Sequence, residues 1–126
     1  MSNKISWMDI PVADLDRATA FYSKLMDLKF TIEEHEGIKF SLCPHKDKEV
    51  AFCLVVEAGF NACQLTHDAP LAYLNVDGRI DDAIKAAKDN GGRILKSKEK
   101  VGPYGYRAVI SDSEGNRVAL HSYEGT

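Results

Sequence analysis

The sequence has no long apolar run, no block of basic residues and no closely spaced pair of cysteines. Crossing a bilayer takes about 20 consecutive apolar residues, and no stretch of this 126-residue chain approaches that length. The first ten residues, MSNKISWMDI, also lack an apolar signal region ahead of a cleavage site. We therefore expect a cytoplasmic protein that neither spans nor binds a membrane.

The charge pattern argues against a nucleic-acid partner. Lys and Arg number 16 against 19 Asp and Glu, which gives a net charge of −3. Proteins that bind a phosphate backbone gather cations into a patch or stripe, whereas these cations are scattered among acids.

The three cysteines, Cys43, Cys53 and Cys63, are spaced ten apart. This spacing matches no zinc motif, and an odd number leaves one thiol over in any disulfide scheme. We expect free, buried or half-buried thiols in a reducing compartment.

Motifs for nucleophilic or phosphate chemistry are missing as well. The sequence contains no G-x-S-x-G, no Walker loop and no H-E-x-x-H. His35, His45 and His67 lie in polar turns or connections, where we expect them to be solvated.

What is present indicates one globular domain over residues 1–126, since 44% hydrophobic and 28% charged residues are ordinary values. Residues 4–12 read as a strand, and Asp14 precedes a helix over 14–26 that it can cap. Strands are expected at 28–33, 37–44 and 49–57, separated by turn-prone segments. The order is βαβββ.

The same order recurs after a connection at 58–70. Ile10 and Val12 align with Leu74 and Val76, and the helix that follows closes on Asn90-Gly91-Gly92. Further strands are expected at 93–98, 104–111 and 116–123. Module one therefore covers about 4–57, and module two about 71–123.

Three segments resemble the vicinal-oxygen-chelate superfamily of glyoxalases, bleomycin resistance proteins and dioxygenases: IPVADLDRATAFYSKLMDLKF, LNVDGRIDDAIKAAKDNGGRIL and VGPYGYRAVISDSEGNRVALHS. The resemblance implies an α+β fold in which two tandem βαβββ modules form a curved, partly open mixed β-sheet barrel with helices outside. It also implies a ligand cavity inside and a homodimer, sometimes with exchanged modules. One fold hosts many functions, so the reaction stays open.

Side chains alternate along a strand, so each strand should present one set to the helices and another to the cavity. Met8 and Ile10 should face the first helix. Ala72, Leu74 and Val76 should face the second helix. In the last strand, Val118 and Leu120 should lie in the core. The predicted cavity set is Ile5, Trp7, Asp9, Leu71, Tyr73, Asn75, Arg117, Ala119 and His121.

Metal-dependent relatives hold a divalent ion at strand positions that correspond to Trp7, Leu71 and Ala119, with a fourth near Cys53. The first three cannot ligate a metal, and one thiolate is a poor substitute for oxygen and imidazole ligands. We therefore expect no metal site of the family's kind. Asp9 and His121 are the alternative ligands for a displaced site.

Within the expected cavity, Trp7 offers a stacking face, and Tyr73, Asn75 and His121 offer hydrogen bonds. A contact between His121 and Asp9 would favour charged imidazole, and Arg117 would favour an anionic ligand. Each also has a structural interpretation: space filling for Trp7, and pairing with Asp9 or Asp112 for Arg117. Tyr104 and Tyr106 either border the cavity entrance or cover the sheet edge.

The resulting hypothesis is metal-independent binding of a small organic ligand, aromatic or anionic, in the cavity between the sheet halves. The alternative is a metal-dependent glyoxalase-like lyase, isomerase or dioxygenase with a displaced divalent-metal site. A third hypothesis is a regulatory or structural dimer with a vestigial cavity.

Overall fold

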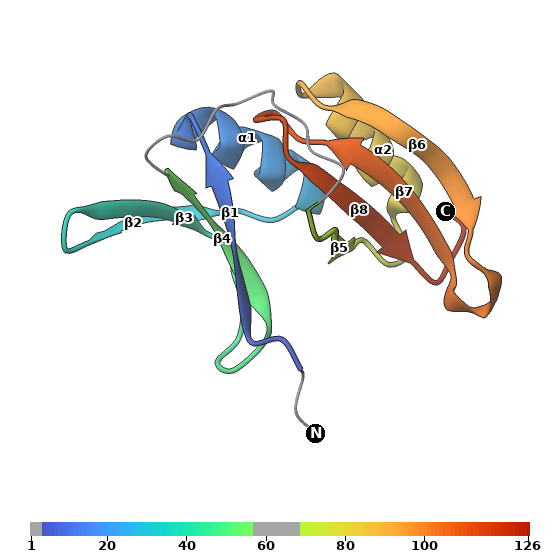
Figure 1. Cartoon of the computed structure of the whole chain (residues 1–126), viewed down its shortest axis with the longest axis horizontal. Coiled ribbons are helices and arrows are strands. Elements are labelled where there is room, and N and C mark those ends of the chain that lie inside the picture. Colours follow the sequence, from blue (N-terminus) through green and yellow to red (C-terminus); the bar gives the residue numbers. More distant parts are fainter. Residues whose placement is uncertain (1–3, 57–68) are drawn as a thin grey trace.

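The computed structural model describes residues 4–56 and 69–126 and shows two modules with the expected element order (Figure 1). The first contains β1 (Trp7–Val12), α1 (Leu15–Met26), β2 (Thr31–His35), β3 (Ile38–Leu42) and β4 (Ala51–Val56). The second contains β5 (Ala72–Asn75), α2 (Ile80–Asp89), β6 (Arg93–Lys100), β7 (Tyr106–Ser111) and β8 (Arg117–Ser122). Most of the connection predicted at 58–70, including Cys63 and His67, lies outside the described residues.

Several boundaries differ from the sequence prediction, and two of the differences have a clear local cause. The strand expected from residue 28 begins only at Thr31, because α1 ends in a left-handed turn at Asp27 (φ 54°). The strand expected from residue 104 begins at Tyr106, because the proline-containing segment Gly102–Tyr104 forms a 3-10 turn. Proline fixes φ and lacks an N–H, so this segment cannot enter the sheet ladder.

Each module forms a separate four-stranded mixed sheet, and the two sheets have equivalent strand orders, β1-β4-β3-β2 and β5-β8-β7-β6. In both, the first and last strands pair in parallel and the remaining neighbours pair antiparallel. The internal repeat is thus confirmed. The sheets are not closed into a barrel, and β1 and β5 are edge strands.

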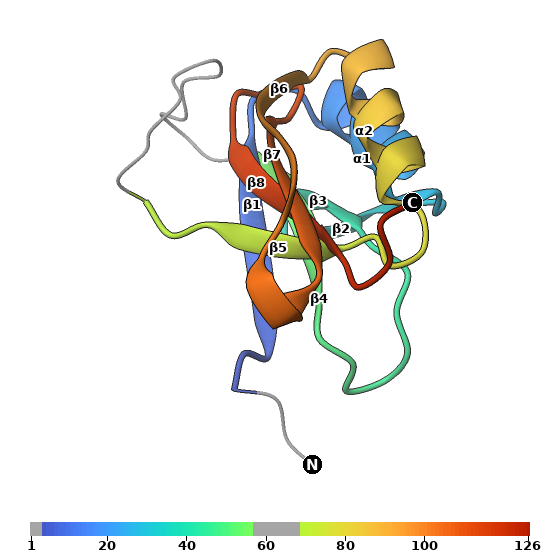
Figure 2. The same ribbon diagram turned by 90° about the vertical axis from the view of Figure 1, so that its right-hand side faces the viewer.

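Both helices lie on the same side of the sheets (Figure 2). Asp14 caps α1 as predicted, its Oδ1 accepting from the Arg17 amide at 3.0 Å, and Gly91 follows α2 with a left-handed φ of 98°. The helices pack against each other and share one core with both sheets. Among the described residues, neither helix is long and apolar enough to cross a membrane.

The predicted side-chain alternation is confirmed for the core-facing positions. Ile10 and Leu74 are buried beside the helices, as are Val118 and Leu120 in β8, and Met8 packs against the same core. The intervening residues therefore point to the opposite side of each sheet, which we call the outer face.

Strand β6 departs from simple alternation. Its register with β7 shifts twice, between Ile94 and Lys96 and again between Lys96 and Glu99. Lys96 opposes Val109 and Glu99 opposes Arg107, so two residues three apart in β6 reach the same face. Bulges of this kind re-aim side chains, and here they place Lys96 and Glu99 together.

The turn between β7 and β8 joins the two modules. The Glu114 carboxylate accepts the amides of Ala13 and Asp14, each at 3.0 Å, ahead of α1. Arg17 donates to the same carboxylate from Nε at 2.6 Å and Nη2 at 2.8 Å. The second module thereby satisfies free backbone donors at the beginning of the first module's helix.

Candidate ligand-binding site

Of three hollows among the described residues, two have β5 as a wall, and the third reaches Leu71, the residue before β5. The largest, about 700 Å³, lies between β5 and the neighbouring strands β1 and β4 of the first module, and we call it the inter-module hollow. The other two, of about 240 and 300 Å³, lie on the outer face of the second sheet. Because β5 is an edge strand, nothing in its own sheet covers the side that faces the first module.

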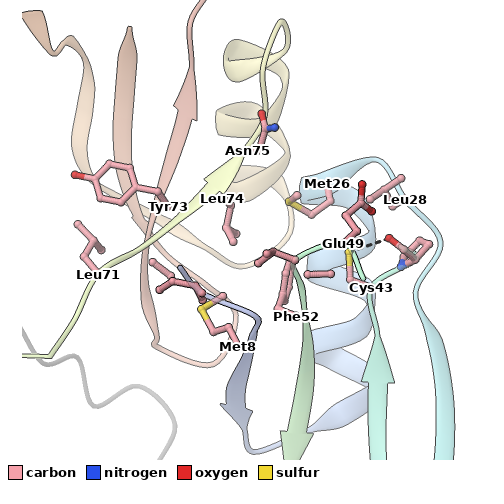
Figure 3. A pocket seen from close by; sticks show the side chains of 15 residues that line it. Met8, Met26, Leu28, Cys43, Glu49, Phe52, Leu71, Tyr73, Leu74 and Asn75 are labelled. Atoms are coloured by element: carbon pink, nitrogen blue, oxygen red, sulfur yellow. Dashed lines mark hydrogen bonds between the residues drawn. The ribbon is translucent and has the colours of Figure 1, made fainter. Parts of the chain in front are cut away.

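The walls of the inter-module hollow are mainly apolar. Leu74 points from β5 toward Met8 and Phe52 of the first module (Figure 3), and Met26 and Leu28 line it at the end of α1. Pockets for organic ligands typically combine such walls with a few polar groups at fixed positions.

Polar groups lie at the rim of this hollow. The Asn75 Oδ1 accepts from the Asp77 amide at 2.9 Å, which fixes the side chain and leaves its NH₂ group as a donor. Glu49 lies on the opposite side of the hollow from Asn75, beside Cys43. Burial, followed by the charge of Glu49, raises the pKa of the Cys43 thiol to about 11. Cys43 is therefore a neutral thiol at neutral pH.

Tyr73 links the inter-module hollow to the outer face of the second sheet. Its ring points away from Leu74 (Figure 3), and its hydroxyl accepts from Arg107 Nη1 at 2.6 Å. Arg107 Nε donates in turn to Glu99 at 3.0 Å. The hydrogen bond to Glu99, and then the one to Tyr73, raises the pKa of Arg107 further. The guanidinium is therefore a permanent cation.

The predicted residues of the second module converge on this region. Tyr73, Asn75 and His121 line the hollow of about 240 Å³, and Leu71 and Arg117 line that of about 300 Å³. Ala119 is fully buried between Tyr73 and Val109, to which it is paired in register.

Two of the predicted first-module residues, Trp7 and Asp9, line none of these three hollows. Trp7 packs edge-on against His45, with ring centroids 5.0 Å apart, and Asp9 accepts from the Cys53 thiol at 3.2 Å. Burial raises the pKa of Cys53 to about 11. Of the first-module cavity set, Ile5 does line the inter-module hollow.

The contact suggested between Asp9 and His121 is not formed. The Asp9 carboxylate pairs with Cys53 across the β1–β4 ladder, whereas His121 Nε2 bonds to the Tyr104 carbonyl at 2.5 Å and its ring packs on Tyr123. The two residues belong to different sheets.

The residues present do not fit the family's metal. Trp7, Leu71 and Ala119 have no ligating atom suited to a divalent ion, and Cys53 lies beside a single carboxylate. Within residues 4–56 and 69–126, no three His, Cys, Asp or Glu side chains come together as a possible metal site. A structural zinc site takes four ligands and a catalytic one three protein ligands.

Some lining residues were missed at the sequence level, notably Phe52, Met26, Lys96 and Arg107. Alternation from Val109 would have placed Arg107 on the outer face, because the two are separated by one residue. No local pattern marks Met26 or Phe52, whose access depends on how the modules pack.

The duplicated βαβββ topology and the hollows along β5 define an α+β protein of paired modules with room for a small ligand. The family model for the glyoxalase/bleomycin resistance protein/dioxygenase superfamily matches residues 4–120. The chain belongs to this superfamily. No curated protein matches it.

Solved structures share the fold at low sequence identity. A glyoxalase/bleomycin resistance protein from Albidiferax ferrireducens T118 has a TM-score of 0.70 at 18% identity, over 95% of this chain and 99% of that one. The fosfomycin resistance protein FosX from Listeria monocytogenes has a TM-score of 0.69 at 19% identity, over 100% and 94%. Glyoxalase I from Zea mays scores 0.68 at 19% identity, over 94% of this chain and 45% of that longer protein.

Proposed function

We propose that the protein binds a small, largely apolar organic ligand in the inter-module hollow without using a metal ion. The observation that carries the proposal is the hollow itself, about 700 Å³ in volume and walled by Met8, Phe52 and Leu74. This volume falls within the range of about 300–1,000 Å³ usual for small-molecule sites. The names of superfamily members, which include bleomycin and fosfomycin resistance proteins, point to small organic ligands as well.

Apolar burial would supply the affinity and Asn75 the orientation. A ligand in contact with Phe52 and Leu74 removes apolar surface from water, worth about 25 cal/mol per Å² before the cost of association. The Asn75 amide, held by Asp77, donates a hydrogen bond at the rim. In this proposal the protein sequesters or carries its ligand and needs no reacting group.

A titration with the neutral fluorescent probe N-phenyl-1-naphthylamine tests the proposal. We expect saturable binding with one site per chain. Ala72→Trp fills the hollow from β5 and should weaken binding at least about tenfold, whereas Ala20→Trp, on the exposed side of α1, should leave it unchanged. Thermal melts of both variants check folding. An absence of saturable binding, or equal binding by both variants, refutes the proposal.

We also propose a homodimer, as the family resemblance implies. The inter-module hollow and the outer faces are open in one chain, so a second copy has room to cover them. Multi-angle light scattering measures the mass directly, and a monomer across the concentrations used for binding contradicts this assembly.

A further inference from the structure

We infer that the ligand of the inter-module hollow is an organic cation, a protonated amine attached to an apolar body, whose charge is received by the Glu49 carboxylate. This inference rests on the function proposed above and names the chemical class of the ligand. Of the fifteen described residues that line the hollow, Glu49 alone carries a charge, and that charge is negative. The same set contains no lysine, arginine or histidine.

The Glu49 carboxylate is held at the rim by its own loop. Its Oε1 accepts from the Lys46 amide, and the Glu49 amide donates to the Lys46 carbonyl, each at 3.1 Å. Within residues 4–56 and 69–126, the second oxygen, Oε2, has no hydrogen-bond partner and Glu49 forms no ion pair. A carboxylate that is already positioned, with one oxygen available, loses little freedom when it accepts from an ammonium group.

The charge of Glu49 acts on the wall of the hollow rather than on the lysines of its loop. Lys46 and Lys48 flank Glu49 in the sequence, but in the described chain neither pairs with it or lines the hollow. After burial, the charge of Glu49 is the second cause of the raised pKa of the Cys43 thiol. Cys43 is 5% exposed, so this field extends into a poorly hydrated wall, where charges are screened less than in water.

The apolar surface that such a ligand needs begins beside this carboxylate. Figure 3 shows Glu49 on the same side of the hollow as Met26 and Leu28. Leu28 is 42% exposed and Phe52 is 5% exposed, so the hollow runs from a wet rim to a dry base. An amine at one end of the ligand stays hydrated beside Glu49 while the apolar end is buried, which avoids the cost of burying the charge.

Three naphthalene probes of similar size test the charge preference: 1-naphthylmethylamine, which is protonated at neutral pH, 1-naphthalenemethanol and 1-naphthoate. Displacement of the neutral fluorescent probe at low salt gives a dissociation constant for each. The amine should bind about three- to tenfold more tightly than the alcohol, and 1-naphthoate more weakly than the alcohol. Added salt should reduce the preference for the amine, because Glu49 is exposed.

Variants of the loop locate the charge. Glu49→Gln retains an oxygen for the Lys46 amide but removes the charge, so the amine and the alcohol should bind within about twofold of each other. Glu49→Lys should reverse the order, and 1-naphthoate should bind more tightly than the amine. This gain for 1-naphthoate cannot result from a loss of folding. The control Asp47→Asn removes an exposed acid of the same loop that does not line the hollow, and it should keep the wild-type order.

Three results overturn the inference: equal affinities of amine and alcohol in the wild type, a preference that persists in Glu49→Gln, or an equal loss of preference in Asp47→Asn. Undiminished binding of the amine to Ala72→Trp, which fills the hollow, would also overturn it. Saturable binding of the neutral probe and the alcohol without preference for the amine refutes this inference alone. If none of the probes binds, the proposed function fails and this inference fails with it.

Discussion

Replacing Glu114 by Gln should destabilise the protein by roughly 3 kcal/mol. The carboxylate is fully buried and accepts two backbone amides, two N–H groups of Arg17 and the Ser113 hydroxyl at 2.9 Å. Burial alone would raise its pKa, but these donors, Arg17 first, lower it from 4.5 to about 2. That difference corresponds to roughly 3 kcal/mol in favour of the charged form, and glutamine resembles the neutral form in shape.

The same pKa predicts how the effect depends on pH. The folded-state pKa lies below the unfolded value, so the stabilisation is fully present above about pH 4.5 and is lost as the pH falls toward about 2. The difference in stability between wild type and Glu114→Gln should therefore shrink over that window. The pKa of the buried Asp112 is raised, mainly by burial, so the contribution of Asp112 to stability changes with pH in the opposite direction. Asp112 is present in both proteins, so this contribution cancels in the comparison.

Urea unfolding followed by circular dichroism at pH 7 and at lower pH measures this difference. The control is Glu34→Gln, which removes an exposed carboxylate on β2 and should change stability by less than about 0.5 kcal/mol. A loss below about 1 kcal/mol for Glu114→Gln at pH 7, or a gap that does not narrow with acid, would show that Glu114 does not join the modules as described.

Three further predictions concern backbone, thiols and metal. Gly105→Ala should lower the free energy of unfolding in urea by about 2 kcal/mol or more, because φ is 92° and a Cβ would lie 2.5 Å from the Ser122 carbonyl oxygen. The control Gly37→Ala, where φ is 80° and a Cβ would meet nothing within 4 Å, should lower it clearly less. Cys43 and Cys53, each with a pKa raised to about 11 by burial, should be alkylated far more slowly at pH 7.5 than a free cysteine peptide, as peptide mass spectrometry would show; equal rates would contradict their burial. Calorimetric titration with nickel, zinc, manganese and iron(II) should show no stoichiometric tight binding, and a strong one-to-one isotherm would favour the metal-dependent alternative.

The repeat and the side-chain alternation could be read from the sequence because both are local properties. Ile10 and Val12 in one module, and Leu74 and Val76 in the other, are buried as their spacing predicted. The Asp14 cap and the glycine after the second helix depend on neighbouring residues alone, and both are confirmed. The family assignment follows from the order of the same short motifs.

The candidate site was only partly predictable. Tyr73, Asn75 and His121 gather in one hollow because they alternate on two paired strands. The bulged register of β6, which determines where Lys96 points, depends on hydrogen bonds to β7 rather than on any local pattern.

By itself, the sequence determined the two βαβββ modules and their core faces. The tertiary structure alone decided which of these faces meet. It separated Asp9 from His121, opened a hollow between Phe52 and Leu74, and seated Glu114 on the first helix. The physical reason is range: alternation and capping act between near neighbours in the chain, whereas module packing sums contacts between residues far apart in it.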